Sequence, residues 1–121
     1  MTNVDILKAD GSPIDERATL TVTFNVKTPT GTARTITGYT AEWNATHNGE
    51  VMITKSTALA TLTVGTSSIT FTLLPINTVL PDVTNYGTPV IYYHEARLIN
   101  GSNEYVAVRG RLPIMPSQTG V

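Results

Sequence analysis

The sequence contains no cysteine in 121 residues. That absence excludes disulfides, thiol nucleophiles and most structural zinc sites, and it fits synthesis in the cytoplasm. No apolar run approaches the roughly 20 residues that span a bilayer. The first residues also lack the basic and apolar regions of a signal peptide. We therefore expect no membrane partner.

Charge is also scarce. The chain has 8 Lys and Arg against 9 Asp and Glu, which gives a net charge of −1. A nucleic-acid or anionic-lipid surface needs a concentration of basic side chains to supply an attractive field. The sequence therefore predicts no nucleic-acid partner, and its low charge indicates that much of the surface meets other protein.

Alternating apolar and polar residues dominate what is present. The clearest cases are Leu20–Val26 and Ile69–Leu73, where threonine fills most of the polar positions. A period of two residues is typical of a strand with one buried face, and threonine suits the solvated face. About seven or eight such strands, separated by short turns, predict one all-β sandwich domain over residues 1–121. We expect its termini, about 1–4 and 115–121, to be flexible or to become ordered on assembly.

The inward positions of these strands predict the core. Trp43 alternates with alanines and is expected to be its large central residue. The predicted core residues are Leu20, Val22, Phe24, Val26, Trp43, Ile69, Phe71, Leu73, Tyr92, Val106, Val108 and Leu112. In the strand Glu50–Ser56, which follows an Asn-Gly turn, we expect Val51 and Ile53 to point inward. Two prolines in 75–81 leave room for about one helical turn.

The last hairpin has two well-separated faces. A two-residue Asn-Gly turn would mix them, so we expect a three-residue loop at Asn100–Ser102 that pairs Ala96 with Val106. In that register Tyr92 would cover the bare backbone of Gly110.

The outer face of this hairpin is the most site-like feature of the sequence. It is expected to carry Tyr93, Arg97, Tyr105, Arg109 and Arg111. Tyrosine and arginine are enriched at the energetic centres of protein interfaces, because they bury much area and still hydrogen-bond at the tip. The alternative is a solvated strand face on which Glu95 and Glu104 balance the arginines. The sequence leaves both readings open.

Catalytic and metal-binding patterns are not evident. His94 and Glu95 are neighbours in a strand and should point to opposite faces, so they cannot act as a base and its orienting partner. Two isolated histidines lack metal-ligand spacing. A calcium site built from Asp5, Asp10, Asp15 and Glu16 is the weaker reading, because Asp10-Gly11-Ser12-Pro13 reads as a turn. We expect no catalytic residue, metal or cofactor, and no enzymatic activity.

Several segments, taken in order, resemble a known family, the small immunoglobulin-like structural proteins of tailed phages. These phage proteins are themselves similar to the N-terminal domain of siphophage baseplate upper proteins. The resemblance covers about residues 18–115, with Asn77 standing where that family usually has Asp. The segments that carry it are residues 20–26, 35–40 (TITGYT), 69–73 (ITFTL), 77–80 (NTVL), 92–98 (YYHEARL) and 109–114 (RGRLPI).

The resemblance implies an immunoglobulin-like antiparallel sandwich and a non-enzymatic role in a phage particle. The chain would be made in the host cytoplasm and reside in the virion, in multiple copies associated with the tail or baseplate. Its partners would be other virion proteins and copies of itself. Decoration of the capsid is the alternative placement. A carbohydrate-binding or host-adhesion module is a second alternative, with Trp43, Tyr86, Tyr93 or Tyr105 stacking on a host surface glycan.

Overall fold

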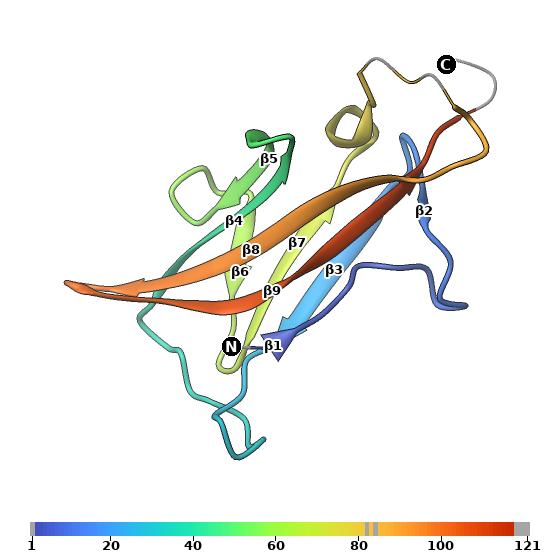
Figure 1. Cartoon of the computed structure of the whole chain (residues 1–121). Coiled ribbons are helices and arrows are strands. Elements are labelled where there is room, and N and C mark those ends of the chain that lie inside the picture. Colours follow the sequence, from blue (N-terminus) through green and yellow to red (C-terminus); the bar gives the residue numbers. More distant parts are fainter. Residues whose placement is uncertain (1, 82, 84, 118–121) are drawn as a thin grey trace.

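The computed structural model describes residues 2–81, 83 and 85–117. Its regular structure is almost entirely β, and its strands form two packed sheets (Figure 1). The elements are β1 (Thr2–Asn3), β2 (Ile14–Asp15), β3 (Leu20–Asn25), β4 (Thr40–His47), β5 (Glu50–Ser56), β6 (Leu62–Val64), β7 (Ser68–Leu73), the 3₁₀ turn η1 (Pro75–Thr78), β8 (Val90–Asn100) and β9 (Asn103–Met115). The turn η1 confirms the single helical turn that the two prolines predict.

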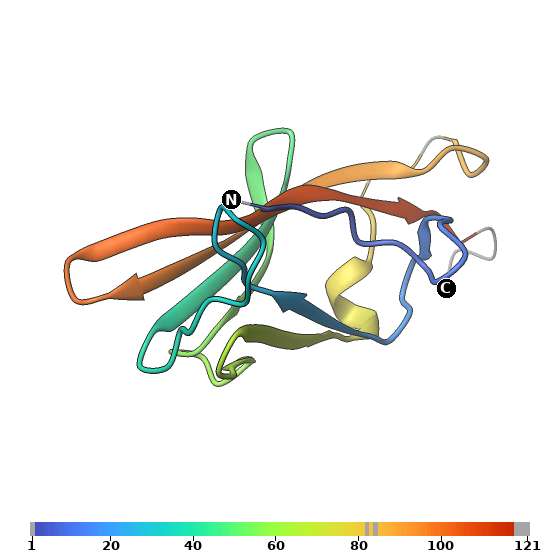
Figure 2. The ribbon, with the colours of Figure 1, turned by 90° about the horizontal axis from the view of Figure 1, so that it is seen from below.

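The strand order confirms the predicted all-β sandwich, but the larger sheet is mixed instead of wholly antiparallel. One sheet runs β1-β9-β8-β4-β5 and the other β3-β7-β6. Seen from below, the long β8–β9 hairpin lies over β3, with η1 between the layers (Figure 2). The pairs are antiparallel except that β1 and β2 run parallel to β9, so the larger sheet is mixed. Among the described residues, no helix is long and apolar enough to cross a membrane.

The core lies between the two sheets and is centred on Trp43, whose side chain is fully buried. Its indole contacts the ring of Phe71 at a centroid distance of 4.3 Å. All the predicted core residues are buried except Leu20 and Val106. Leu20 is half-buried and packs against the core, whereas Val106 lies opposite the exposed Arg97 on the other face of the sheet.

The predicted register of the last hairpin is wrong. Asn100 pairs with Asn103 across a two-residue turn, and Arg97, not Ala96, pairs with Val106. Ala96 pairs with Val108, which leaves Ala107 as an extra residue in β9. A bulge of this kind shifts one strand by a residue and restores the inward direction of the side chains that follow it. The apolar pattern is therefore satisfied by a bulge inside the strand instead of by a longer loop.

A second bulge, in β5, turns Val51 outward, opposite to the predicted direction. Thr46 pairs with Val51 and Ala45 with Ile53, so Met52 is the extra residue in β5. Ile53 points inward as predicted, but Val51 joins Thr46 on the outward side and is 58% exposed. The prediction for Val51 failed because alternation was assumed to run unbroken through the strand.

Both described ends of the chain make backbone contacts with the sandwich. Val4 N–H donates to the Arg109 carbonyl (2.8 Å) and Ile6 N–H to that of Arg111 (2.9 Å), extending the contact of β1 with β9. At the other end, the backbone N–H of Ser117 donates to Glu16 (2.8 Å). Residues 2–4 and 115–117 therefore lie against the sandwich, while residues 1 and 118–121 lie outside the described part of the chain.

Candidate interaction surface

The candidate site is the side of β9, β8, β4 and β5 that faces away from the other sheet, called the outer face below. The register places Val51, Thr46, Tyr93 and Arg111 in one row across these four strands. Tyr93 is 59% exposed, and Val51, two strands away in the same row, is 58% exposed. These two exposed apolar side chains, with only Thr46 between them, form the part of this face best suited to bind another protein.

Charged groups of the outer face neutralise one another. Glu95 accepts from Arg97 Nε (2.7 Å) and from an Arg109 guanidinium nitrogen (3.0 Å), and Arg97 also reaches Glu104 (3.0 Å). The hydrogen bond from Arg97 is the main reason that the pKa of Glu95 is lowered. Such exposed pairs contribute only about 0–1 kcal/mol each to stability. The main consequence of these ion pairs is that the outer face carries several charges but attracts charged partners only weakly.

Arg111 is paired outside this cluster. Its guanidinium lies 3.2 Å from an oxygen of Asp5, and its backbone N–H donates to the other oxygen of the same carboxylate (3.0 Å). All three predicted interface arginines therefore have carboxylate partners. Glu95 and Glu104 balance Arg97 and Arg109, as the alternative expected, but Arg111 is paired with Asp5. The arginines hold the face and the N-terminal segment in place, while Tyr93 remains open.

Polar groups on β4 and β5 complete the surface. Asn44 donates to Glu42 (2.7 Å) and accepts from Thr54 (2.8 Å), which fixes a polar row beside Tyr93. A shallow hollow of about 450 Å³ runs over these strands. It is lined by Glu42, Asn44, Thr46, Val51, Tyr93, His94, Glu95, Arg97, Arg109 and Gly110. Three of the five predicted interface residues thus line one continuous depression.

Tyr105 does not belong to this surface, and its predicted position is wrong. It pairs with Leu98, a fully buried residue, and so points toward the inner side of the sheet. Its ring meets Tyr39 edge-on at 6.1 Å, and the Arg34 guanidinium lies 4.3 Å from the ring centroid. The cause is the bulge at Ala107, which reverses the direction of every side chain between it and the turn.

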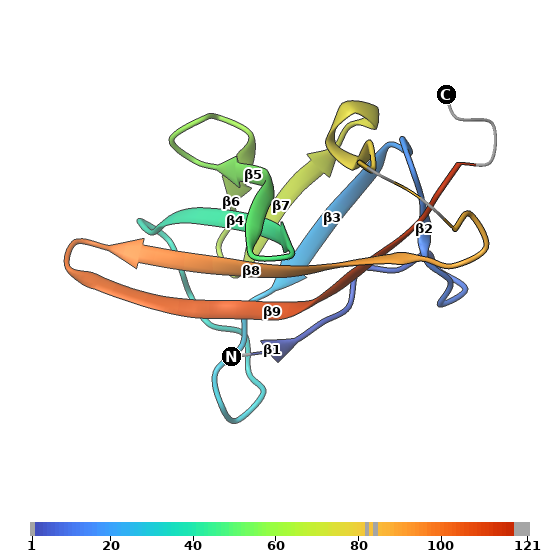
Figure 3. The same ribbon diagram turned by 45° about the horizontal axis from the view of Figure 1, so that its top comes forward.

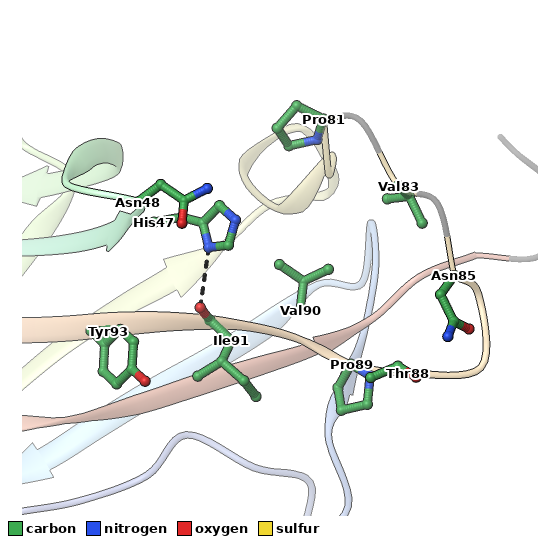
Figure 4. A pocket seen from close by; sticks show the side chains of 10 residues that line it. All are labelled: His47, Asn48, Pro81, Val83, Asn85, Thr88, Pro89, Val90, Ile91 and Tyr93. Atoms are coloured by element: carbon green, nitrogen blue, oxygen red, sulfur yellow. Dashed lines mark hydrogen bonds between the residues drawn. The ribbon is translucent and has the colours of Figure 1, made fainter.

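A second hollow, of about 380 Å³, lies at the end of the sandwich near Tyr93 (Figure 4). The His47 ring points into it, and its Nδ1 lies 3.2 Å from the Ile91 carbonyl oxygen. Since a carbonyl can only accept, Nδ1 carries the proton in this contact. None of the described residues that line the hollow carries a carboxylate.

His94 lies in the interior and links the N-terminal segment to the core. Its Nδ1 accepts from the Trp43 indole N–H (3.1 Å), so in the neutral ring Nε2 carries the proton and donates to the Val4 carbonyl (2.7 Å). Burial lowers the pKa of His94 and keeps the ring neutral. Glu95 points to the outer face, which confirms that this histidine and glutamate lie on opposite sides.

The acidic residues considered for calcium have separate partners. Asp5 binds Arg111, Asp10 accepts from Ser12, and Asp15 pairs with Lys8 (2.8 Å). Glu16 accepts the N–H of Leu80 (2.7 Å). In the part of the chain that is described, no three His, Asp or Glu side chains gather as metal ligands would.

The aromatic residues considered for glycan stacking are divided between core and surface. Trp43 is buried and unavailable, and Tyr105 is half-buried against Tyr39. Tyr93 and Tyr86, which is 43% exposed, remain open.

No protein-family model matches this chain, and no curated protein matches it.

Sequence reasoning identified Tyr93 and the arginines but missed Val51. A signal for Val51 was present, because a two-residue Asn48-Gly49 turn fixes Thr46 opposite Val51 and so gives both residues one direction. It also missed the contact between His94 and Val4, which joins residues 90 positions apart and leaves no periodic trace in the sequence.

Proposed function

We propose that this chain is a non-enzymatic structural protein of a tailed-phage particle, present in multiple copies at the tail or baseplate. The observation that carries the proposal is the outer face, where exposed Tyr93 and Val51 lie beside charges that are already paired. The resemblance of residues 18–115 to immunoglobulin-like phage structural proteins supplies the biological setting. Capsid decoration is the same function at another place on the particle.

Such a face suits repeated protein contacts. Fully burying a large apolar side chain contributes about 1.5–3 kcal/mol, so one tyrosine gives a weak contact and many copies give a firm assembly. The paired charges around Glu95 need no partner of opposite sign. Contacts of this kind tolerate neighbours whose surfaces are also neutral and flat.

A competition experiment tests the role of Tyr93. Cells infected with the phage that encodes this chain would express equal amounts of tagged wild-type protein and tagged Tyr93→Glu protein. A buried interface contact predicts at least a tenfold lower incorporation of the variant into purified particles, which corresponds to about 1.4 kcal/mol. The matched control is Ile76→Glu, because Ile76 is also highly exposed and apolar but lies on η1, away from the outer face.

Equal incorporation of Tyr93→Glu and wild type would remove the outer face from the assembly contact. Failure of even the tagged wild-type protein to enter particles would contradict the whole proposal. Separating tails from heads before measuring the tag distinguishes the two placements, since a baseplate protein remains with tails and a decoration protein with heads.

Glycan binding is the second candidate, favoured by one specific feature. Tyr93 is an exposed aromatic ring beside the hydrogen-bonding groups of Glu42 and Asn44 in the same hollow. This function predicts that a Tyr93→Ala change abolishes binding to a glycan array while the Ile76→Glu control binds normally. An array on which the wild-type chain binds nothing would exclude it.

A further inference from the structure

The strand β3 is an uncovered edge of the smaller sheet. Within the described residues it pairs with β7 alone, and it lies at the margin of the sheet (Figure 3). The Val26 N–H donates to Ser67 (2.8 Å) in the register that continues β3 against β7. Hydrogen-bonded pairs alternate along an antiparallel ladder, so the backbone groups of Thr21, Thr23 and Asn25 point away from β7.

The described residues of the N-terminal segment do not hydrogen-bond to this edge. The segment runs beside β3, but Val4 and Ile6 direct their N–H groups to β9 in the other sheet. A hollow of about 170 Å³ remains between residues 4–7 and residues 20–24. Leu7, 36% exposed, flanks it. Thr21, Thr23 and Asn25 are exposed, and no described residue hydrogen-bonds to their outward backbone groups.

The other sheet edges carry features that prevent pairing. The strand β6 has only 3 residues. The strand β5 is interrupted by the bulge at Met52 and points the Lys55 side chain inward, where it is 5% exposed and donates to Asn77 (2.8 Å). Short strands, bulges and inward charges are the usual protection of an edge. The strand β3 has 6 residues without a charge, proline, glycine or bulge.

We propose that β3 pairs antiparallel with β3 of a second copy of this chain, with Thr23 on the two-fold axis. In this register Thr23 faces Thr23 and Thr21 faces Asn25, and the two three-stranded sheets become one continuous sheet. A two-fold contact requires a surface that is complementary to itself, and an uncharged strand meets its own copy without repulsion. A partner recognised by charge would find no opposite charge on this edge.

Hydroxyl contacts already present on β3 favour the same register. Thr21 and Thr72 lie 3.2 Å apart through their hydroxyls, and so do Thr23 and Thr70. A second copy with Thr23 on the axis continues this row directly from Thr70 to its counterpart. Matched threonine pairs across neighbouring strands add a modest stabilisation to each step of such a ladder.

The absence of native cysteine makes the register testable by single-cysteine variants. Opposed residues in a hydrogen-bonded antiparallel pair have Cα atoms about 5.5 Å apart, which is within the range that a disulfide spans. Thr23→Cys is expected to form a disulfide dimer with itself under mild oxidation. Thr21→Cys should do so only when mixed with Asn25→Cys. The control is Thr63→Cys, an exposed threonine on β6.

The proposal is overturned if Thr23→Cys forms dimers no faster than Thr63→Cys. A dimer that forms with Thr21→Cys alone but not with Thr23→Cys would overturn the register.

A second measurement is sedimentation equilibrium of the wild-type chain and of Thr23→Pro. The Thr23 N–H points away from β7, so proline at this position leaves the β3–β7 ladder intact but removes a donor at the interface. We expect at least a tenfold weaker self-association at an unchanged melting temperature. If Thr23→Pro fails to fold, Thr23→Lys replaces it and places two like charges on the axis. A wild-type chain that stays monomeric, or variants that associate as well as wild type, would contradict the proposal.

This inference is separable from the function proposed above. A chain that dimerises through β3 but never enters particles would leave the inference standing and remove the phage role. A chain that enters particles but does not dimerise through β3 would support the phage role and remove the inference.

Discussion

Replacing Gly110 with alanine should force the N-terminal segment away from β9. An ideal Cβ at this position would overlap the Val4 carbonyl oxygen and lie 2.6 Å from the Val4 carbonyl carbon and 3.0 Å from His94 Nε2. Backbone atoms cannot rotate out of the way as a flexible side chain can. The segment around Val4 must therefore shift as a whole.

The structure sets the magnitude of this effect. The shift would break the bonds from Val4 N–H to Arg109 (2.8 Å), from Ile6 N–H to Arg111 (2.9 Å) and from His94 to Val4 (2.7 Å). Each contributes about 1 kcal/mol net, and an unpaired donor at His94 costs about 1–3 kcal/mol more. Alanine is favoured over glycine in a strand by about 0.5–1 kcal/mol, which offsets part of this loss. We expect a net destabilisation of roughly 3–5 kcal/mol.

Urea unfolding followed by tryptophan fluorescence measures the effect, because Trp43 is the only tryptophan and lies in the core. The matched control is Gly87→Ala, where a Cβ would meet only Asn85 at an ordinary 3.5 Å. A chain with residues 2–5 deleted completes a double-mutant cycle, since it has no Val4 to obstruct the new methyl group. There Gly110→Ala should be neutral or slightly stabilising. Equal destabilisation with and without residues 2–5, or a change below about 0.5 kcal/mol in the full chain, would refute the reasoning.

Three further predictions concern buried polar groups. Burial lowers the pKa of His94 below 6.5, so in mild acid the folded chain binds fewer protons than the unfolded chain. The free energy of unfolding should therefore be highest above about pH 6.5. Below that pH it should fall by at most about 1.4 kcal/mol per pH unit. Urea midpoints between pH 5 and 8 measure this, and a flat profile that matches His94→Gln would contradict it. Trp43→Phe should lower the free energy of unfolding by about 2–4 kcal/mol, because it removes core volume and leaves His94 Nδ1 without its donor. Thermal unfolding measures this change, and a decrease below about 1 kcal/mol would disprove the prediction. Lys55→Met should be neutral or stabilising, since burial lowers the pKa of Lys55 and its ammonium donates to Asn77, which carries no charge. Urea unfolding measures this, and a loss above about 2 kcal/mol would show that the ammonium is needed.

Alternation in the sequence was sufficient to predict most of the fold. The strands around Phe24 and Phe71 are both visible as runs of period two, and each is buried on one face as that period requires. Trp43 was recognisable as the centre of the core because its same-face neighbours are alanines, which leave space for a large ring. These features depend on residues close together in the chain.

The two bulges could not be predicted in the same way. An extra residue at Ala107 and a longer hairpin loop give the same inward pattern over most of β9, so alternation alone does not distinguish them. The choice decides the direction of Tyr105, and the similar bulge at Met52 decides that of Val51. The predicted outward direction was therefore correct for Tyr93 and the arginines, whereas the predicted directions of Tyr105 and Val51 were wrong.

Contacts of long sequence separation were beyond the reach of pattern analysis. The requirement for glycine at position 110 comes from Val4, which approaches from the other end of the chain. The sequence suggested that Gly110 needs a neighbour and assigned Tyr92 to that place. The observed register puts His94 opposite Gly110 and the N-terminal backbone over it.

Quantitative mass spectrometry of density-gradient-purified particles tests the proposed function most directly. The proposed function implies a phage genome that encodes this chain, and the particles would come from that phage. The major capsid protein would serve as the internal standard for copy number. The account predicts a fixed number of copies per particle, well above one, that survives high-salt washing because the contact does not depend on net charge. Particles that lack the chain, or carry fewer than one copy each, would contradict it.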